Sequence, residues 1–195
     1  MKKIAVLLSL LLLAFCAGCS NNSEEALALT PDPVLSESRY TLGEKMGDYT
    51  ITDVNGVSHS FSEILAEKKA IVLNFWFINC GPCRIEFPYM NEAYESLKAD
   101  IEILAINPTG ESEEDIKAFS EEMGLAFPVA VGDLEWNNAF YIQGFPTTVV
   151  IDRTGTISFM HTGYIDSTET FMDIFEFFIS EDYTPTVVKN ISDIK

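Results

Sequence analysis

The chain has 195 residues, of which 47% are hydrophobic and 12% aromatic. This composition supplies a good-sized core for one globular domain and excludes an intrinsically disordered chain. With 30 acidic residues against 12 basic ones, the formal net charge is −18. A surface this negative repels nucleic acids and anionic lipid headgroups, so we expect no nucleic-acid partner.

The N-terminus predicts an export signal. A basic start at residues 1–3 precedes an apolar run over residues 4–15, which is too short to span a membrane as a stable helix. Small residues at positions 17 and 18 then precede Cys19, an arrangement that resembles the signal of bacterial lipoproteins. The resemblance implies a signal peptide over residues 1–18 and a lipid anchor to the membrane on Cys19. The alternative is an ordinary signal peptide that releases a soluble protein.

The next segment predicts a flexible tether. Residues 19–41 are mostly polar, contain Pro31 and Pro33, and show little periodicity. A globular pattern follows over residues 42–180, where we place the folded domain. Residues 181–195 are a C-terminal tail with no predicted structure.

The domain begins with a predicted β-hairpin. Two short alternating runs, residues 49–52 and 58–61, flank a turn that contains Asn55-Gly56. Ser62 then predicts the cap of a short helix over residues 63–68.

A strand–helix–strand unit follows the hairpin. The apolar run at residues 71–77 predicts a strand buried on both faces, and residues 101–106 predict a second one. Between them, residues 80–98 predict a helix, in which Pro88 should introduce a kink.

The rest of the domain continues the alternation of helices and strands. Its predicted elements are a helix over 112–123 ended by Gly124, a strand over 127–131, a helix over 134–141, a hairpin of strands 147–152 and 156–162, and a helix over 166–180. This order predicts an α/β fold with a central mixed β-sheet flanked by helices on both faces.

Cys80 and Cys83 are the candidate redox pair. Cys16 would leave with the signal peptide and Cys19 would carry the lipid, so only these two cysteines remain in the domain. An extracytoplasmic compartment permits disulfides. A pair this closely spaced closes almost no loop and gains little as a structural crosslink, which favours a chemical role.

The motif Cys80-Gly81-Pro82-Cys83 stands where a predicted strand ends and a helix begins. A helix N-terminus carries partial positive charge and free N–H groups, which stabilise a thiolate at Cys80. Gly81 and Pro82 let the chain turn tightly into the helix. Cys83 would then be close enough to attack the mixed disulfide that Cys80 forms with a partner. The motif therefore predicts thiol–disulfide exchange.

Four other roles for the cysteine pair stay open, although the sequence supports each of them less well. A zinc site needs about four ligands, and only His59 and His161 could add nitrogen donors. A Sco-type copper site uses a wider cysteine spacing, and a peroxiredoxin site needs Thr and Arg partners. A purely structural disulfide is the fourth. We interpret both histidines as structural and predict no metal site.

The motifs that resemble a known family lie on both sides of the cysteine pair. They are residues 74–76 (NFW), the CGPC motif itself, residues 84–90 (RIEFPYM), the N-terminal hairpin from Gly47 to Gly56, and residues 144–148 (GFPTT). Together they resemble the TlpA/ResA group of extracytoplasmic thioredoxin-like proteins, over about residues 42–180. The resemblance implies a thioredoxin-like fold with an N-terminal β-hairpin, and a redox-active disulfide in place of any bound cofactor.

The resemblance also implies roles for single residues. Pro146 matches the family's cis-proline beside the disulfide, and a plain turn proline is the alternative. Phe145 would offer its backbone to a substrate chain, much as an added strand does. Glu86, one helical turn after Cys83, would influence the protonation of the two thiols, and a surface acid is the alternative.

Two residues of the preceding strand complete the implied site. Asn74 stands where cytoplasmic thioredoxins carry a buried Asp, so Glu86 is the better candidate for proton handling. Trp76 is expected to pack under the active loop. Residues 77–79 (FIN) differ from the family's small residue, Thr and Trp before the first cysteine, which alters the surface that meets a partner.

These features predict a membrane-anchored extracytoplasmic thiol–disulfide oxidoreductase. The Gly-Pro pair resembles reducing thioredoxins, so we expect a reductase of disulfides in exported proteins, supplied with electrons by a membrane thiol carrier of the CcdA or DsbD kind. The substrates that the resemblance implies are apocytochrome c, an exported methionine sulfoxide reductase or a spore-envelope protein. The alternatives are a disulfide-forming oxidase and a non-catalytic binding module of the same fold.

Overall fold

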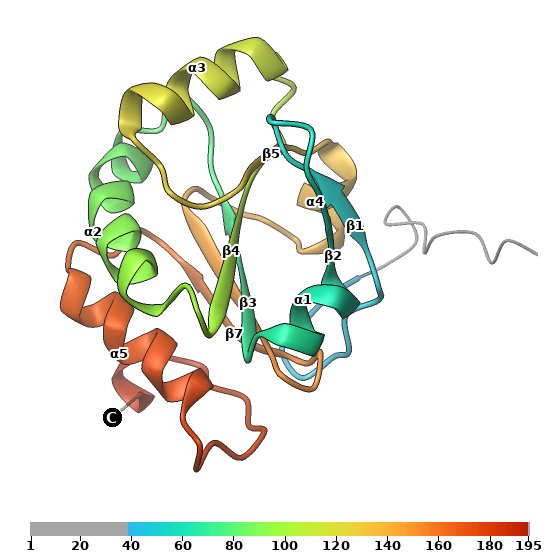
Figure 1. The fold of residues 1–195 in the computed structure, drawn as a ribbon, viewed down its shortest axis with the longest axis vertical. Coiled ribbons are helices and arrows are strands. Elements are labelled where there is room, and N and C mark those ends of the chain that lie inside the picture. Colours follow the sequence, from blue (N-terminus) through green and yellow to red (C-terminus); the bar gives the residue numbers. More distant parts are fainter. Residues whose placement is uncertain (1–38, 195) are drawn as a thin grey trace, which may run out of the picture. The chain divides into compact units, whose positions relative to one another are not determined.

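The computed structural model describes residues 39–194, which form a β-sheet with helices on both faces (Figure 1). The strands of the sheet lie in the order β5-β4-β3-β6-β7. They span Ala70–Phe75 (β3), Ile101–Asn107 (β4), Val129–Val131 (β5), Thr147–Asp152 (β6) and Ile157–Thr162 (β7). Because β3 pairs in parallel with β4 and antiparallel with β6, the sheet is mixed, and the predicted fold class is confirmed.

The central strands β3 and β4 are buried along their whole length. Successive side chains of β3 point to opposite faces, so Val72 belongs to one hydrophobic core while Ile71 and Leu73 belong to the other. The prediction that this apolar run is a strand buried on both faces is therefore confirmed.

The α-helices divide between the two faces of the sheet. They span Phe61–Glu67 (α1), Gly81–Leu97 (α2), Glu113–Met123 (α3), Leu134–Ala139 (α4) and Thr168–Ile179 (α5). One core takes side chains from α2, α3 and α5, and the other takes them from α1 and α4. Figure 1 shows α2 and α5 on one side of the sheet, with α1 and α4 on the other.

The predicted N-terminal hairpin is present, but the start of the helix after it differs from the prediction. Strands Thr50–Thr52 (β1) and Ser58–Ser60 (β2) pair antiparallel, with Ile51 opposite His59. Helix α1 begins directly after β2 because Ser60, in an extended conformation, accepts the N–H of Glu63 at 3.4 Å. The prediction of Ser62 as the cap is therefore wrong, since Ser62 lies inside the first turn.

Helices α2 and α3 begin and end within a residue or so of the predicted positions. Helix α2 starts directly after Cys80 and continues through Pro88 without a break. Helix α3 is capped by Ser112, which accepts the N–H of Asp115 at 3.1 Å, and it ends at Gly124 in the left-handed conformation with φ of 62°. Local capping patterns therefore fix both ends of α3.

The C-terminal segment, for which the sequence predicted no structure, packs against the domain. The Tyr183 hydroxyl donates to Asp152 Oδ2 at 2.9 Å, and its ring lies 5.6 Å from that of Phe178. Val188 forms a bridge with β7, and a 3₁₀ turn at Ile191–Asp193 leads to the buried Ile194.

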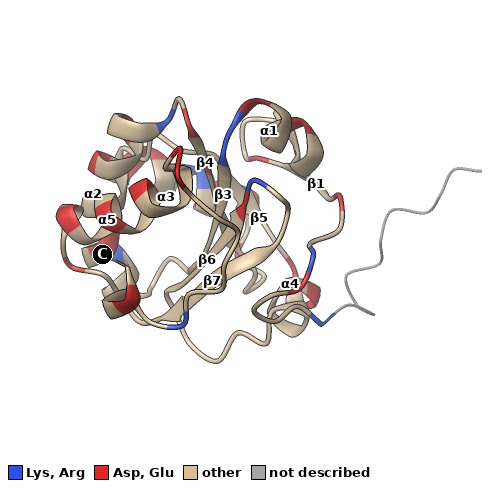
Figure 2. Ribbon diagram, turned by 90° about the horizontal axis from the view of Figure 1, so that it is seen from below, with Lys and Arg blue, Asp and Glu red and all other residues tan. Residues whose placement is uncertain are grey.

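The predicted signal peptide, Cys19 and the tether up to residue 38 lie outside the described residues. The described part begins against α4, where the Arg39 guanidinium donates to the carbonyl of Asn138 and the Tyr40 N–H to that of Ala139, both at 2.7 Å. Within residues 39–194, no helix combines the length and apolarity needed to cross a bilayer. Acidic residues are spread over the helices of this domain (Figure 2).

Candidate active site

Cys80 and Cys83 form a disulfide at the N-terminus of α2, with their Cα atoms 5.2 Å apart. Cys80 is the N-cap residue and Cys83 lies in the first turn. Cys83 is fully buried and Cys80 is 3% exposed, whereas Gly81 and Pro82 between them are exposed. Cys80 is therefore the more accessible cysteine, as expected of an attacking nucleophile.

The start of α2 is arranged to stabilise negative charge on Cys80. The backbone N–H of Cys83 donates to Cys80 Sγ at 3.1 Å. Pro82 has no N–H to leave unpaired in this first turn. In the reduced protein, the same donor and the dipole of this helix of 17 residues would favour the thiolate of Cys80.

The carboxyl group of Glu86 is completely buried one helical turn after Cys83. Its Oε1 accepts the side-chain amide N–H of Asn74 at 2.8 Å, and its Oε2 accepts the backbone N–H of Ile165 at 2.9 Å. Burial raises the pKa of Glu86 to about 7, although both hydrogen bonds oppose this increase. The side chain is therefore not a surface acid, and it gains or loses a proton near neutral pH.

Asn74 connects this carboxyl to the centre of the sheet. It lies on β3 directly opposite Thr148 of β6, and its amide nitrogen donates to the Thr148 hydroxyl at 3.3 Å as well as to Glu86. Its Oδ1 atom is buried and has no hydrogen-bond partner within the described part of the chain. The side-chain amide of Asn74 on β3 is thus hydrogen-bonded to the carboxyl of Glu86 on α2.

The peptide bond between Phe145 and Pro146 is cis, as the family resemblance implies. The Phe145 ring packs edge-to-face on Phe77, with ring centroids 5.4 Å apart. Phe77 precedes the cysteine pair, and its carbonyl accepts the N–H of Cys80 at 3.1 Å. These contacts bring the cis-proline segment to the loop that carries Cys80. Among residues 39–194, no hydrogen bond uses the N–H or C=O of Phe145, which leaves both for a partner chain.

Trp76 anchors the base of the same loop. Its indole ring is fully buried, stacks on Phe119 of α3 at 4.9 Å and meets the edge of Phe87 of α2 at 5.3 Å. The end of the strand that leads into the active loop is therefore fixed against α2 and α3.

A second acidic residue, Glu111, was not singled out by the sequence analysis. Its Oε2 accepts the backbone N–H of Ile78 at 2.9 Å and the side-chain amide of Asn107 at 2.6 Å. It thereby holds the loop just before Cys80. The signal that could have found it is its place after β4, because the carboxyl ends of the parallel strands β3 and β4 meet at one edge of the sheet.

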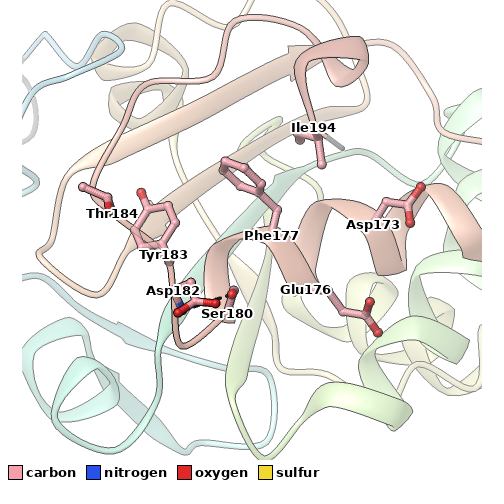
Figure 3. Close-up of a pocket in the computed structure, with 8 residues that line it drawn as sticks. All are labelled: Asp173, Glu176, Phe177, Ser180, Asp182, Tyr183, Thr184 and Ile194. Atoms are coloured by element: carbon pink, nitrogen blue, oxygen red, sulfur yellow. Dashed lines mark hydrogen bonds between the residues drawn. The ribbon is translucent and has the colours of Figure 1, made fainter.

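His161 and a hollow beside α5 lie outside this constellation. His161 stacks on Phe159, and burial lowers its pKa. The hollow lies between α5 and the C-terminal segment (Figure 3), and it contains neither cysteine. Its lining residues are Asp173, Glu176, Phe177, Ser180, Asp182, Tyr183, Thr184 and Ile194. We assign no part of the redox chemistry to either feature.

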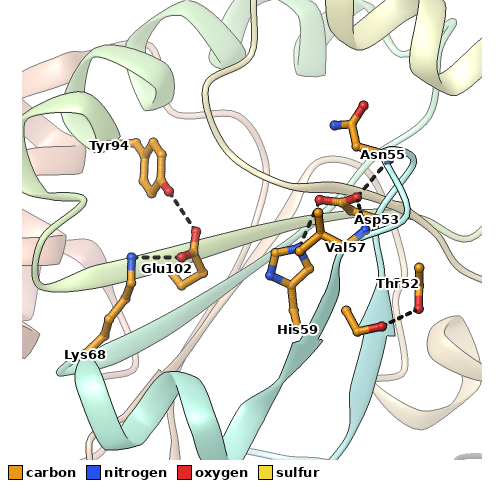
Figure 4. A network of polar contacts seen from close by, with 9 residues as sticks. Thr52, Asp53, Asn55, Val57, His59, Lys68, Tyr94 and Glu102 are labelled. Atoms are coloured by element: carbon orange, nitrogen blue, oxygen red, sulfur yellow. Dashed lines mark hydrogen bonds and ion pairs between the residues drawn. The ribbon is translucent and has the colours of Figure 1, made fainter.

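Two clusters of polar side chains lie near the N-terminal hairpin, and their members bond to one another (Figure 4). His59 Nε2 lies 3.0 Å from Asp53 Oδ2, and Asp53 also accepts two backbone N–H groups of the hairpin turn. Glu102 accepts the Tyr94 hydroxyl and pairs with Lys68, both at 2.8 Å. No group of three or more His, Cys, Asp or Glu side chains within residues 39–194 is arranged to hold a metal ion.

Comparison with known proteins agrees with the chemistry of this site. Residues 42–160 match the model of the AhpC/TSA family. The thiol-disulfide oxidoreductase ResA of Geobacillus kaustophilus is 37% identical over 124 residues, which cover 63% of this chain and 70% of that protein. ResA of Halalkalibacterium halodurans is 34% identical over 136 residues, which cover 68% and 76% of the two chains.

A solved structure shows the same architecture. It is a thiol:disulfide interchange protein of the thioredoxin family from Chlorobium tepidum TLS, with a TM-score of 0.61 and 25% sequence identity over 72% of this chain and 99% of that chain. The family match covers more than half of the chain, and the ResA relatives exceed 30% identity over more than two thirds of their own length. The chain therefore belongs to the AhpC/TSA family and, within it, is a ResA-like thiol–disulfide oxidoreductase of thioredoxin fold.

Proposed function

We propose that this oxidoreductase reduces disulfide bonds of exported proteins, with Cys80 as the attacking nucleophile and Cys83 as the resolving thiol. The observation that carries the proposal is the combination of two features on α2. A cysteine pair opens the helix, and a buried carboxyl with a pKa of about 7 follows one turn later. Exchange needs a stabilised thiolate for attack and a proton acceptor for resolution, and the two features meet these needs.

The reaction proceeds in two displacements. The Cys80 thiolate attacks one sulfur of the substrate disulfide, and the other substrate sulfur leaves as a thiolate. Cys83 then loses its proton and attacks Cys80 Sγ, which forms the Cys80–Cys83 disulfide and expels the remaining substrate sulfur as a thiolate. Two electrons pass to the substrate, whose thiolates take up protons according to the pH.

Glu86 serves the second displacement in this scheme. Cys83 is fully buried, so its thiol has little access to bulk water as a proton acceptor. Glu86 follows it by one turn on the same helix, and its carboxylate form accepts the proton. A pKa of about 7 suits this transfer, because the acceptor is then available near neutral pH and releases the proton again.

The substrate chain is positioned by the cis-proline segment. The backbone groups of Phe145 are not used within residues 39–194, and the Phe145 side chain contacts the loop before Cys80. An extended substrate segment that pairs with this backbone, as an added strand would, brings its disulfide to Cys80.

The proposal also includes the cellular location of the protein and the source of its electrons. A lipid anchor on Cys19 would hold the domain at the outer face of the cell membrane through the segment that follows it. A membrane thiol carrier of the CcdA or DsbD kind would return the Cys80–Cys83 disulfide to the dithiol. The substrates considered above, apocytochrome c among them, follow from the family resemblance.

A trapping experiment tests the exchange mechanism. A Cys83→Ala variant attacks substrates but does not resolve the intermediate, so proteins linked to Cys80 should accumulate and separate after addition of dithiothreitol. The matched control is Cys80→Ala, which retains the buried Cys83 and should trap far less. If the two variants give the same set of partners, or if Cys83→Ala gives none, the assignment of attacking and resolving thiols is wrong.

The redox potential tests the direction. A reductase should have a potential near that of reducing thioredoxins, about −270 mV, and a value near that of a strong oxidase, about −120 mV, would overturn the proposed direction. Equilibration of the purified domain with glutathione or dithiothreitol buffers gives this value. A further control is reduction of insulin, which a non-catalytic binding module would not perform.

A further inference from the structure

An exposed apolar stripe runs from the cysteine pair along α2. Pro82, Ile85 and Tyr89 are spaced so that they share one face of the helix. Ile85 is 53% exposed and Tyr89 is 36% exposed, and Pro82 is exposed as well. Single exposed apolar residues are common, but these three start at the redox site and recur along one face of the helix.

Tyr164 is 49% exposed, and it directly precedes Ile165, whose backbone contacts α2. This face also carries Glu92, whose Oε2 accepts the Thr168 hydroxyl at 2.8 Å. Closer to the cysteines, Glu86 accepts the backbone N–H of Ile165 at 2.9 Å. Ile165 lies between β7 and α5, and Thr168 is the first residue of α5. Because both contact α2, this part of the chain runs alongside the helix, and we infer that the exposed Tyr164 extends the apolar surface of the stripe.

The surroundings of the stripe are acidic. After Arg84, helix α2 contains no Lys or Arg, and residues 163–179 contain none either. Glu92, Asp166 and Glu169 are exposed there, and Figure 2 shows acidic residues along α2 and α5. Arg84 itself pairs with α3, through Glu122 at 3.0 Å. The stripe therefore combines apolar contacts with a negative border.

We propose that the stripe formed by Pro82, Ile85, Tyr89 and Tyr164 docks the substrate polypeptide beside its disulfide. The preferred segment carries an aromatic or aliphatic side chain next to its cysteine and Lys or Arg within the following few residues. The apolar side chain buries surface against the stripe, and the cation meets the acidic border. An acidic segment is repelled, which gives selectivity among exported proteins. The inference rests on the proposed reductase function.

Oxidation rates of the reduced protein by three disulfides test the docking. The first is a short disulfide-bonded peptide with Tyr and two Lys beside one cysteine, the second has Glu in place of both Lys, and the third is bis(2-hydroxyethyl) disulfide, which is too small to reach the stripe. The variants are Tyr89→Ser with Tyr164→Ser, and Asp166→Asn with Glu169→Gln. The control is Tyr141→Ser, since Tyr141 is 71% exposed and follows α4, which packs on the opposite face of the sheet.

We expect the wild type to react at least tenfold faster with the basic peptide than with the acidic one at low salt. The double tyrosine variant should react about tenfold more slowly than the wild type with the basic peptide. The double acid variant should lose most of the preference for the basic over the acidic peptide. The small disulfide should react equally with every variant, and Tyr141→Ser should match the wild type throughout.

Three results would overturn the docking surface. The first is that the wild type and the double tyrosine variant react equally fast with the basic peptide. The second is that the double tyrosine variant reacts equally slowly with the small disulfide, and the third is that Tyr141→Ser slows the reaction with the basic peptide to the same extent. Failure of the wild type to react even with the small disulfide would instead refute the proposed reductase function, so the two failures are distinguishable.

Discussion

Replacing Glu86 by Gln should change how the folding stability depends on pH. Burial raises the pKa of this carboxyl from 4.5 to about 7 in the native protein. The native state thus holds the proton more tightly than the unfolded chain does. The contribution of Glu86 to the free energy of unfolding is therefore fully present below about pH 4.5 and is lost as the pH rises through about 7.

The size of this effect follows from the shift. One pKa unit corresponds to about 1.36 kcal/mol, so an increase from 4.5 to about 7 corresponds to about 3 kcal/mol. The side chain is 0% exposed, so solvent does little to screen the effect. A Gln side chain has nearly the same volume and no charge. The Asn74 Oδ1 atom, which lacks a partner within the described residues, is available to accept its N–H once the Asn74 amide turns over.

Urea denaturation of the oxidised proteins at several pH values between about 4.5 and 8 provides the measurement. The free energy of unfolding of Glu86→Gln minus that of the wild type should increase by about 3 kcal/mol over this range. Glu92→Gln is the matched control, since it removes an exposed acid from the same helix, and its curve should follow that of the wild type. Parallel curves for Glu86→Gln and the wild type would refute the raised pKa, and with it the physical basis for proton transfer from Cys83.

Three further predictions concern neighbouring features. Asn74→Ala removes a hydrogen bond that favours the charged form of Glu86, so the pKa of Glu86 should rise further, and the same titration should show the loss of stability at higher pH. Tyr183→Phe deletes the donor to Asp152 and should lower the free energy of unfolding by about 1–3 kcal/mol without changing the rate of disulfide exchange. Gly132→Ala would place a Cβ atom 2.6 Å from a side chain of β4. We expect a loss of about 1–3 kcal/mol in urea denaturation, and an unchanged midpoint would show that this neighbour moves aside freely.

The strands and helices could be predicted because their signals are local. The apolar run of β3 and the capping pattern at Ser112 and Gly124 need no knowledge of the rest of the chain. The start of α1 was misplaced because Ser60 and Ser62 are equally good caps by type. The choice between them depends on a tertiary contact, since Asp48 Oδ1 accepts the N–H of Ser62 at 3.0 Å within the first turn.

The candidate site was only partly predictable for the same reason. The position of Cys80 at a helix start follows from the CGPC motif alone. The burial of Glu86 depends on Ile165, which lies 79 residues further along the chain. The role of Glu111 requires knowledge that β4 pairs in parallel with β3. Likewise, no local pattern in residues 181–194 predicts that Tyr183 reaches across to the β6–β7 hairpin.

The energetics of Glu86 argue that it is present for chemistry rather than for stability. At neutral pH and above, a buried carboxyl with this pKa destabilises the native state, and an apolar or amide side chain of similar size would avoid the loss. The fold nevertheless provides it with two hydrogen bonds, from strand β3 and from the segment before α5. These contacts fix the carboxyl one turn from Cys83 and hold its pKa below the value that burial alone would give. Transfer of the Cys83 proton to this carboxyl, as proposed for the resolution step, would account for an acid held in this way.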